Sequence, residues 1–110
     1  DPLEIDVLEV KKMLDSGKNF KLIDVREPSE YQICKINGTT LIPLGEFEAM
    51  DPARLNGLRQ QDEIVLHCKA GVRSLKAANA LIKMGYSNVK SMRGGITEWS
   101  DKIDASVPKY

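Results

Sequence analysis

Cys68 is the residue of this sequence that is best placed for chemistry. It follows the apolar run at residues 64–67, and a short loop containing Gly71 then leads into a segment of helical spacing. A thiol at such a junction faces the free backbone N–H groups and the positive dipole end of the next helix, which both lower its pKa. Lys69 and Arg73 add positive charge beside it. A cysteine that ends a buried strand is often only a small core residue, but this loop favours a nucleophile.

The loop after Cys68 is suited to cradle an anion. If it curls so that successive N–H groups point inward, they stabilise a thiolate and any anionic sulfur or oxyanion attached to it. Gly71 permits such a curl because glycine adopts backbone angles that other residues avoid. We therefore predict Cys68 as the catalytic residue. The predicted substrate-binding loop comprises Lys69, Ala70, Gly71, Val72 and Arg73.

The sequence offers this thiol no general base. The single histidine, His67, precedes Cys68, and neighbouring side chains on a strand point to opposite faces. We therefore interpret His67 as a structural residue. A nucleophile without a base suits a reaction whose leaving group is already a good one, so sulfur transfer is favoured over amide hydrolysis.

Four other side chains could take part in the chemistry or could be purely structural. Asp24 and Arg26 end a buried strand, where they could orient the loop or simply pair with each other, and pairing is favoured. Cys34 lies in an apolar context and is interpreted as a core residue, with a disulfide to Cys68 left open. Arg73 could bind an anionic donor or face outward on a helix, and binding is favoured.

Composition limits the classes of function. The 110 residues are enough for one domain, and 16 basic residues balance 16 acidic ones, which argues against nucleic acid or a membrane surface as a partner. Two cysteines and one histidine make neither a disulfide framework nor a metal site, so we expect no metal or other cofactor and a reducing cytoplasmic location. We also expect neither a membrane span nor a signal peptide. The start at Asp1 is compatible with a domain of a longer protein.

The spacing of apolar residues alternates between short runs and helical periods, which predicts an α/β domain with a largely parallel sheet. Strands are expected at residues 21–25, 40–42, 63–68 and 89–92. Helices are expected at residues 7–14 with Asp6 as the N-cap, at 27–33, at 46–58 with a break at Pro52, at 73–84, and after Gly94 and Gly95 around Trp99. Residues 101–110 are expected to form a polar tail.

Four segments together resemble the rhodanese domain in their order and spacing. They are Leu22-Ile23-Asp24-Val25-Arg26-Glu27-Pro28-Ser29-Glu30-Tyr31, Ile42-Pro43-Leu44, Cys68-Lys69-Ala70-Gly71-Val72-Arg73-Ser74, and Arg93-Gly94-Gly95-Ile96 followed by Trp99. The resemblance covers nearly the whole chain, so that residues 1–110 form a single rhodanese domain. It implies an α/β fold with a central, mainly parallel five-stranded sheet and helices on both faces. It also implies that Cys68 carries sulfane sulfur as a covalent persulfide, cradled by the backbone of residues 69–73.

Loop length distinguishes this family from cysteine phosphatases and arsenate reductases. Those enzymes resemble one another in using a longer loop, with five residues between Cys and Arg in the phosphatases, which is wide enough to surround a phosphate. Here only four residues separate Cys68 from Arg73. The shorter loop fits the rhodanese pattern, whose ring surrounds the outer persulfide sulfur, so phosphatase or arsenate chemistry is the less favoured alternative.

Three further segments resemble the carboxy-terminal rhodanese domain of adenylyltransferase–sulfurtransferase proteins. They are Tyr31-Gln32-Ile33-Cys34-Lys35-Ile36, Leu66-His67-Cys68-Lys69 and Ile103-Asp104-Ala105-Ser106-Val107-Pro108-Lys109-Tyr110. This resemblance implies an E1-like partner domain that adenylates the C-terminus of a ubiquitin-like sulfur carrier, which the rhodanese persulfide then attacks to leave a thiocarboxylate. The products feed molybdopterin, thiamine or tRNA thiolation pathways.

Two classes of function therefore remain. The first is a sulfurtransferase that takes sulfur from thiosulfate or from a cysteine desulfurase persulfide, and a free-standing thiosulfate sulfurtransferase would carry the same catalytic segments. The second is a catalytically silent rhodanese-like module that only binds partners. Cys68, Gly71 and Arg73 are all present and favour the enzyme, because a silent module has no need of a thiol at the centre of the cradle.

Overall fold

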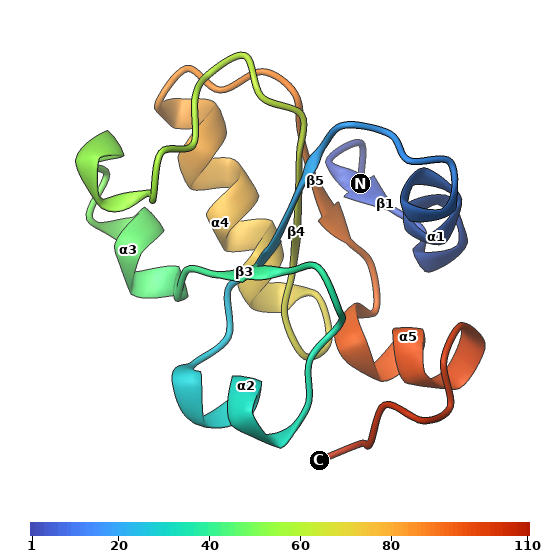
Figure 1. Cartoon of the computed structure of the whole chain (residues 1–110). Coiled ribbons are helices and arrows are strands. Elements are labelled where there is room, and N and C mark those ends of the chain that lie inside the picture. Colours follow the sequence, from blue (N-terminus) through green and yellow to red (C-terminus); the bar gives the residue numbers. More distant parts are fainter.

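A sheet of five parallel strands forms the centre of the computed structural model, which describes all 110 residues (Figure 1). In spatial order the strands are β1 (Glu4–Ile5), β5 (Val89–Met92), β4 (Ile64–His67), β2 (Lys21–Asp24) and β3 (Thr40–Leu41). Every pairing between neighbouring strands is parallel. The predicted α/β class with a central parallel sheet is therefore confirmed.

Helices connect the strands and cover both faces of the sheet. They are α1 (Val7–Asp15), α2 (Pro28–Ile33), α3 (Leu44–Glu48), α4 (Val72–Lys83) and α5 (Gly95–Lys102), with a 3-10 turn, η1, at Pro52–Arg54. Figure 1 shows α1 and α5 on one side of the sheet and α3 and α4 on the other. The expected caps are present, because the Asp6 side chain accepts the N–H of Leu8 and Pro28 begins α2.

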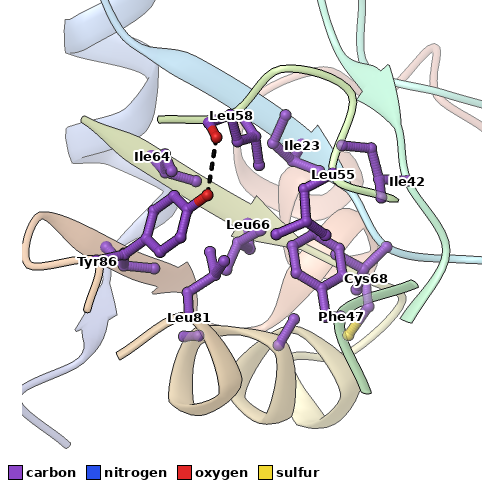
Figure 2. Close-up of a cluster of buried hydrophobic side chains, with 14 residues drawn as sticks. Ile23, Ile42, Phe47, Leu55, Leu58, Ile64, Leu66, Cys68, Leu81 and Tyr86 are labelled. Carbon is purple, nitrogen blue, oxygen red and sulfur yellow. Dashed lines mark hydrogen bonds between the residues drawn. The ribbon is translucent and has the colours of Figure 1, made fainter. Parts of the chain in front are cut away.

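Alternating side chains on the strands build two separate cores. Ile23 and Leu66 face the core beneath α3 and α4, which also contains Cys68 beside Phe47 (Figure 2). Leu22 and Val65 face the other core, beneath α1 and α5. Each face of the sheet is thus sealed from water, as an all-parallel sheet requires.

The carboxyl ends of the central strands meet at one edge of the sheet. Asp24 at the end of β2 pairs in register with His67 at the end of β4, and β5 runs parallel beside β4. The loop that begins with Cys68, the segment after Asp24 and the glycines before α5 therefore lie at the same edge. In open α/β sheets this edge is where ligands bind.

The structure differs from the sequence-based expectations at both ends of the chain. Glu4 and Ile5 form the short edge strand β1, which the residue pattern did not indicate. The predicted polar tail is wrong: α5 continues to Lys102, Val107 is buried, and the Ser100 hydroxyl donates to its carbonyl at 2.6 Å. The chain then returns toward α2 (Figure 1). No helix of the structure is both long and apolar enough to cross a membrane.

Candidate active site

The sulfur of Cys68 lies inside a ring of hydrogen-bond donors. Cys68 directly follows β4 and is only 1% exposed. Its Sγ accepts the backbone N–H of Gly71 at 3.1 Å and that of Ser74 at 3.4 Å, and the Ser74 hydroxyl lies 3.5 Å away. The inward-pointing N–H groups that the sequence predicted are therefore present around the thiol.

This ring changes the acidity of the thiol. Burial raises the pKa of Cys68, but hydrogen bonds outweigh it and hold the pKa below its ordinary value. The donors responsible are the Ser74 hydroxyl and the backbone N–H groups of Ser74, Gly71 and Ala70. A lowered pKa means that the site stabilises the thiolate, which is the nucleophilic form of cysteine.

The N-terminus of α5 holds the loop in this shape. The carbonyl of Cys68 accepts the N–H of Ile96 at 2.9 Å, and the carbonyl of Lys69 accepts the N–H of Thr97 at 3.1 Å. Gly95 makes this approach possible, because a Cβ there would stand 2.4 Å from the Lys69 oxygen. With both carbonyls bound by α5, the following N–H groups are left to face the sulfur.

A left-handed glycine then turns the loop into α4. Gly71 caps this helix with a φ of 106°, a backbone angle that residues with a side chain rarely adopt. It also packs tightly, since a Cβ at this position would meet the backbone nitrogen of Gly94 at 3.3 Å. The requirement for glycine at position 71 is therefore both conformational and steric.

The other loop residues take different positions around the sulfur. Ala70 and Val72 are exposed, and Val72 is the most exposed large hydrophobic residue, at 67%. Lys69 is half-buried, with its ammonium 4.6 Å from the centre of the Tyr110 ring. Arg73 is also half-buried, and its guanidinium forms a two-pronged ion pair with Glu30 on α2. Arg73 is thus neither outward-facing nor an unpaired cation.

His67 makes no hydrogen bond to the thiol of Cys68. It is fully buried, its Nδ1 lies 3.3 Å from the Cys68 carbonyl, and its Nε2 has no hydrogen-bond partner. Burial lowers the pKa of His67, although Asp24 opposes this effect from 3.7 Å. The imidazole is therefore held neutral, and the structural interpretation of His67 is consistent with its position.

Asp24 and Arg26 pair with each other, as the sequence indicated. Both are fully buried, and the Arg26 guanidinium donates to both Asp24 oxygens, at 2.7 Å from Nη2 and 3.0 Å from Nε. Arg26 also donates to the Cys34 carbonyl and to the Tyr110 hydroxyl. Cys34 is buried in the core beneath α1 and α5, while Cys68 belongs to the opposite core, and both thiols are free.

Comparison with known proteins identifies the family. A family model described as the rhodanese-like domain matches residues 6–102. The chain belongs to this family. The human single-domain sulfurtransferase TSTD1 has the same fold as this rhodanese domain, with a TM-score of 0.80 and 28% identity over 91% of this chain and 96% of that one.

Relatives with longer chains contain this rhodanese domain as one part. The chain is 38% identical over 102 residues to the Mycobacterium tuberculosis protein named "Probable adenylyltransferase/sulfurtransferase MoeZ", covering 93% of this chain and 26% of that protein. It is 33% identical over 105 residues to the Zea mays adenylyltransferase and sulfurtransferase MOCS3-2, covering 93% of this chain and 22% of that protein. The rhodanese domain thus spans about a quarter of the length of these relatives.

Sequence reasoning missed three residues of the rhodanese site. Ser74 stands in the first turn of α4 and donates to the sulfur, so its place after the loop was a usable signal. Glu30 is 43 positions from Arg73, and Tyr110 is 80 positions from Glu30. No local pattern reports such long-range pairs, so the fold was needed to find them.

Proposed function

We propose that this rhodanese domain is a sulfurtransferase that carries sulfane sulfur as a persulfide on Cys68. The observation that supports the proposal most is the ring of donors around Sγ, from Gly71 and Ser74, with no histidine or carboxylate hydrogen-bonded to the sulfur. Such a ring stabilises a sulfur anion but does not activate water. It therefore favours a reaction in which sulfur is both the nucleophile and the atom transferred.

The proposed reaction has two steps. The Cys68 thiolate attacks the outer sulfur of a donor such as thiosulfate, forming a new S–S bond while the old one breaks and sulfite leaves with the electron pair. A thiophilic acceptor then attacks the outer sulfur of the persulfide, and the Cys68 thiolate leaves. Gly71 and Ser74 donate to the anionic sulfur at the start and end of this cycle. The sulfur is carried covalently, so the proposal involves no metal or other cofactor.

The relatives suggest a physiological context for the same chemistry. MoeZ and MOCS3-2 combine adenylyltransferase and sulfurtransferase in their names. We propose a ubiquitin-like sulfur carrier, adenylated at its C-terminus by an E1-like domain, as the acceptor. The outer persulfide sulfur would attack the activated carbonyl and displace AMP, and a thiol would then cleave the S–S bond to release the thiocarboxylate. A cysteine desulfurase persulfide is the alternative donor.

For this context we propose a role in molybdenum cofactor biosynthesis or a related thiolation pathway, in the cytoplasm. A reducing compartment would keep Cys34 and Cys68 as the free thiols that the structure contains. Neither nucleic acid nor a membrane is part of the proposal, since the basic and acidic residues balance.

Mass spectrometry of the intact protein after exposure to thiosulfate tests the sulfurtransferase proposal. We expect a gain of one sulfur atom that maps to Cys68 and disappears when cyanide is added. A Cys34→Ala variant should gain sulfur as the unmodified protein does. An unmodified mass after incubation with both thiosulfate and a protein persulfide would contradict the proposal and favour a silent binding module.

A further inference from the structure

Tyr110 joins two charged side chains beside the active-site loop. Its hydroxyl accepts a hydrogen bond from Arg26 at 2.9 Å and donates one to Glu30 at 2.7 Å. Its ring faces the ammonium of Lys69, whose nitrogen lies 4.6 Å from the ring centre. The two hydrogen bonds fix the ring in one orientation, because a phenol that both accepts and donates has little freedom to rotate.

Lys69 and Arg73, the two cations of the loop, differ in what they contact. Arg73 is neutralised by the two-pronged contact with Glu30. The Lys69 ammonium forms no ion pair or side-chain hydrogen bond, and it lies 4.6 Å from the centre of the Tyr110 ring. Lys69 is therefore the loop cation that no carboxylate neutralises, whereas Glu30 neutralises Arg73.

We propose that Tyr110 is a positioning residue that holds Lys69 as the group that attracts anionic sulfur donors to Cys68. This inference rests on the proposed function and names the residues that select the donor. A lysine side chain has many rotamers in water, and an aromatic face selects those that place the ammonium over the ring. The ring is itself fixed to Arg26, whose guanidinium is buried against Asp24. The buried pair of Arg26 and Asp24 thus helps to fix the position of the Lys69 ammonium, through Tyr110.

The segment that carries Tyr110 is anchored independently of the loop. Val107 is buried in the core beneath α1 and α5, and its carbonyl accepts the hydroxyl of Ser100. A substitution at position 110 therefore leaves these anchors in place. Variants of Tyr110 should consequently keep the fold and report on Lys69 rather than on global unfolding.

Steady-state kinetics with thiosulfate provides the first test, in a double-mutant cycle of Lys69→Met and Tyr110→Leu. We expect each single variant to raise KM about three- to tenfold, as a cation–aromatic contact of ordinary strength would, with kcat changed less than about twofold. The double variant should have the KM of Lys69→Met alone, because Tyr110 acts through Lys69. Effects that multiply in the double variant, or a KM for Tyr110→Leu within about twofold of the unmodified protein, would overturn the proposal.

Tyr31→Leu is the matched control. The Tyr31 ring also faces a lysine, Lys35, at 5.0 Å, but its hydroxyl donates to the Thr39 carbonyl rather than to Glu30. This variant should leave the KM for thiosulfate unchanged. Tyr110→Phe keeps the ring and loses only its two hydrogen bonds, so its KM should lie between those of the unmodified protein and Tyr110→Leu. A Tyr31→Leu effect as large as that of Tyr110→Leu would show that any aromatic loss weakens donor use, and would also overturn the proposal.

A second measurement does not depend on sulfur transfer. The rate of Cys68 alkylation by iodoacetate, an anion, is compared with the rate for neutral iodoacetamide. We expect the ratio of the two rates to fall by the same factor in Lys69→Met and Tyr110→Leu, and to stay constant in Tyr31→Leu. An unchanged ratio in Tyr110→Leu, with a lowered ratio in Lys69→Met, would overturn the positioning role of Tyr110 but not the role of Lys69. A protein that accepts no sulfur but shows the expected ratios would instead refute the proposed function and retain Tyr110 as the residue that positions Lys69.

Discussion

The guanidinium of Arg73 donates to both carboxylate oxygens of Glu30, at 2.7 and 3.0 Å. This pair ties the first turn of α4, next to the loop, to α2 on a separate part of the chain. Tyr110 donates to the same carboxylate, so Glu30 accepts from the side chains of two residues at once. Glu30 also caps its own helix by accepting the N–H of Glu27. Arg73, which the sequence favours as a donor-binding residue, therefore forms an ion pair with a carboxylate that also contacts two other residues. Its role in donor binding stays a prediction.

Acid should break the Glu30 ion pair and destabilise the fold. The hydrogen bond from Arg73, opposed by burial, lowers the pKa of Glu30 to about 2 from its usual 4.5. A lowered pKa stabilises the fold fully above pH 4.5, and this contribution, at most about 3 kcal/mol, is lost as the pH falls toward 2. Between pH 6 and pH 2.5, the free energy of unfolding, measured with denaturant, should fall less for Glu30→Gln than for the unmodified protein.

The control for this experiment is Glu46→Gln. Glu46 forms a similar pair with Arg54, whose side chain is half exposed to solvent, so its contribution to the acid dependence should be much smaller. Equal acid dependence of the unmodified protein and Glu30→Gln would show that the pair with Arg73 does not stabilise the fold.

Cys68→Ala and Cys68→Ser should abolish sulfur transfer while the protein stays folded. Each change removes the nucleophile with little change in volume, so the loss of stability should be about 1 kcal/mol. Cys34→Ala, at the other buried thiol, should keep the activity. A thiosulfate:cyanide assay and thermal unfolding of the three variants check this expectation. Full activity in a Cys68 variant would rule out this residue as the sulfur carrier.

Alkylation of Cys68 should depend on pH with a midpoint below about 8.5, the usual thiol value. The thiolate is favoured in the folded protein because donors led by Ser74 outweigh burial, so the pKa of Cys68 is lowered. Ser74→Ala removes one of these donors and should raise the midpoint. Ser100→Ala, which removes another buried hydroxyl, should not move it. The pH profile of iodoacetamide labelling distinguishes these results, and a midpoint unmoved by Ser74→Ala would exclude its hydroxyl from the site.

The same lowered pKa makes folding more favourable in base. The Cys68 contribution is complete above the unfolded thiol pKa of about 8.5 and disappears as the pH falls through the lower folded value. Relative to Cys68→Ser, the unmodified protein should therefore gain stability as the pH rises toward 8.5. A loss of stability as the pH rises would mean that burial raises the pKa of Cys68 by more than the hydrogen bonds lower it.

Gly95→Ala should displace the active-site loop. The added Cβ would stand 2.4 Å from the Lys69 carbonyl oxygen and 2.5 Å from that of Cys68, at a φ of 60°. The strained backbone alone should cost about 1–3 kcal/mol of stability, and sulfur transfer should fall further than stability does. Gly45→Ala meets no atom within 4 Å and should lower neither quantity. Denaturant unfolding and the sulfurtransferase assay compare the two variants, and an active Gly95→Ala would disprove the close approach.

Local patterns in the sequence predicted much of this fold. The strand around Leu66 and the helix around Ala78 were predicted because their apolar periods differ, and the loop between them because Gly71 and Cys68 stand at the junction. These features depend on residues that are near one another in the chain.

The features that were missed depend on distant residues. β1 contains only Glu4 and Ile5, which are too few to show a period, and it exists because β5 offers a free edge. The tail looked polar because Ile103 and Val107 are its only strongly apolar aliphatic residues beyond alanine and proline, yet both pack in the core beneath α1 and α5. The contacts of Tyr110 join the end of the chain to α2, and no local pattern predicts them.

The last prediction concerns the size of the loop. Inserting one glycine between Val72 and Arg73 would restore five residues between Cys68 and Arg73, the spacing of a phosphate-sized ring. It would also move the Ser74 N–H, now 3.4 Å from Sγ, one position further along the chain. Backbone donors stabilise charge only within about 3 Å of where it develops, so the widened ring should hold a persulfide poorly.

We expect the inserted variant to lose sulfur transfer and the unmodified protein to hydrolyse no aryl phosphate, both measured by standard colorimetric assays. Gly45→Ala serves as the folded reference. Equal sulfurtransferase rates in the inserted and unmodified proteins would show that loop length does not separate this site from a phosphatase, and would remove the main physical reason for rejecting that alternative.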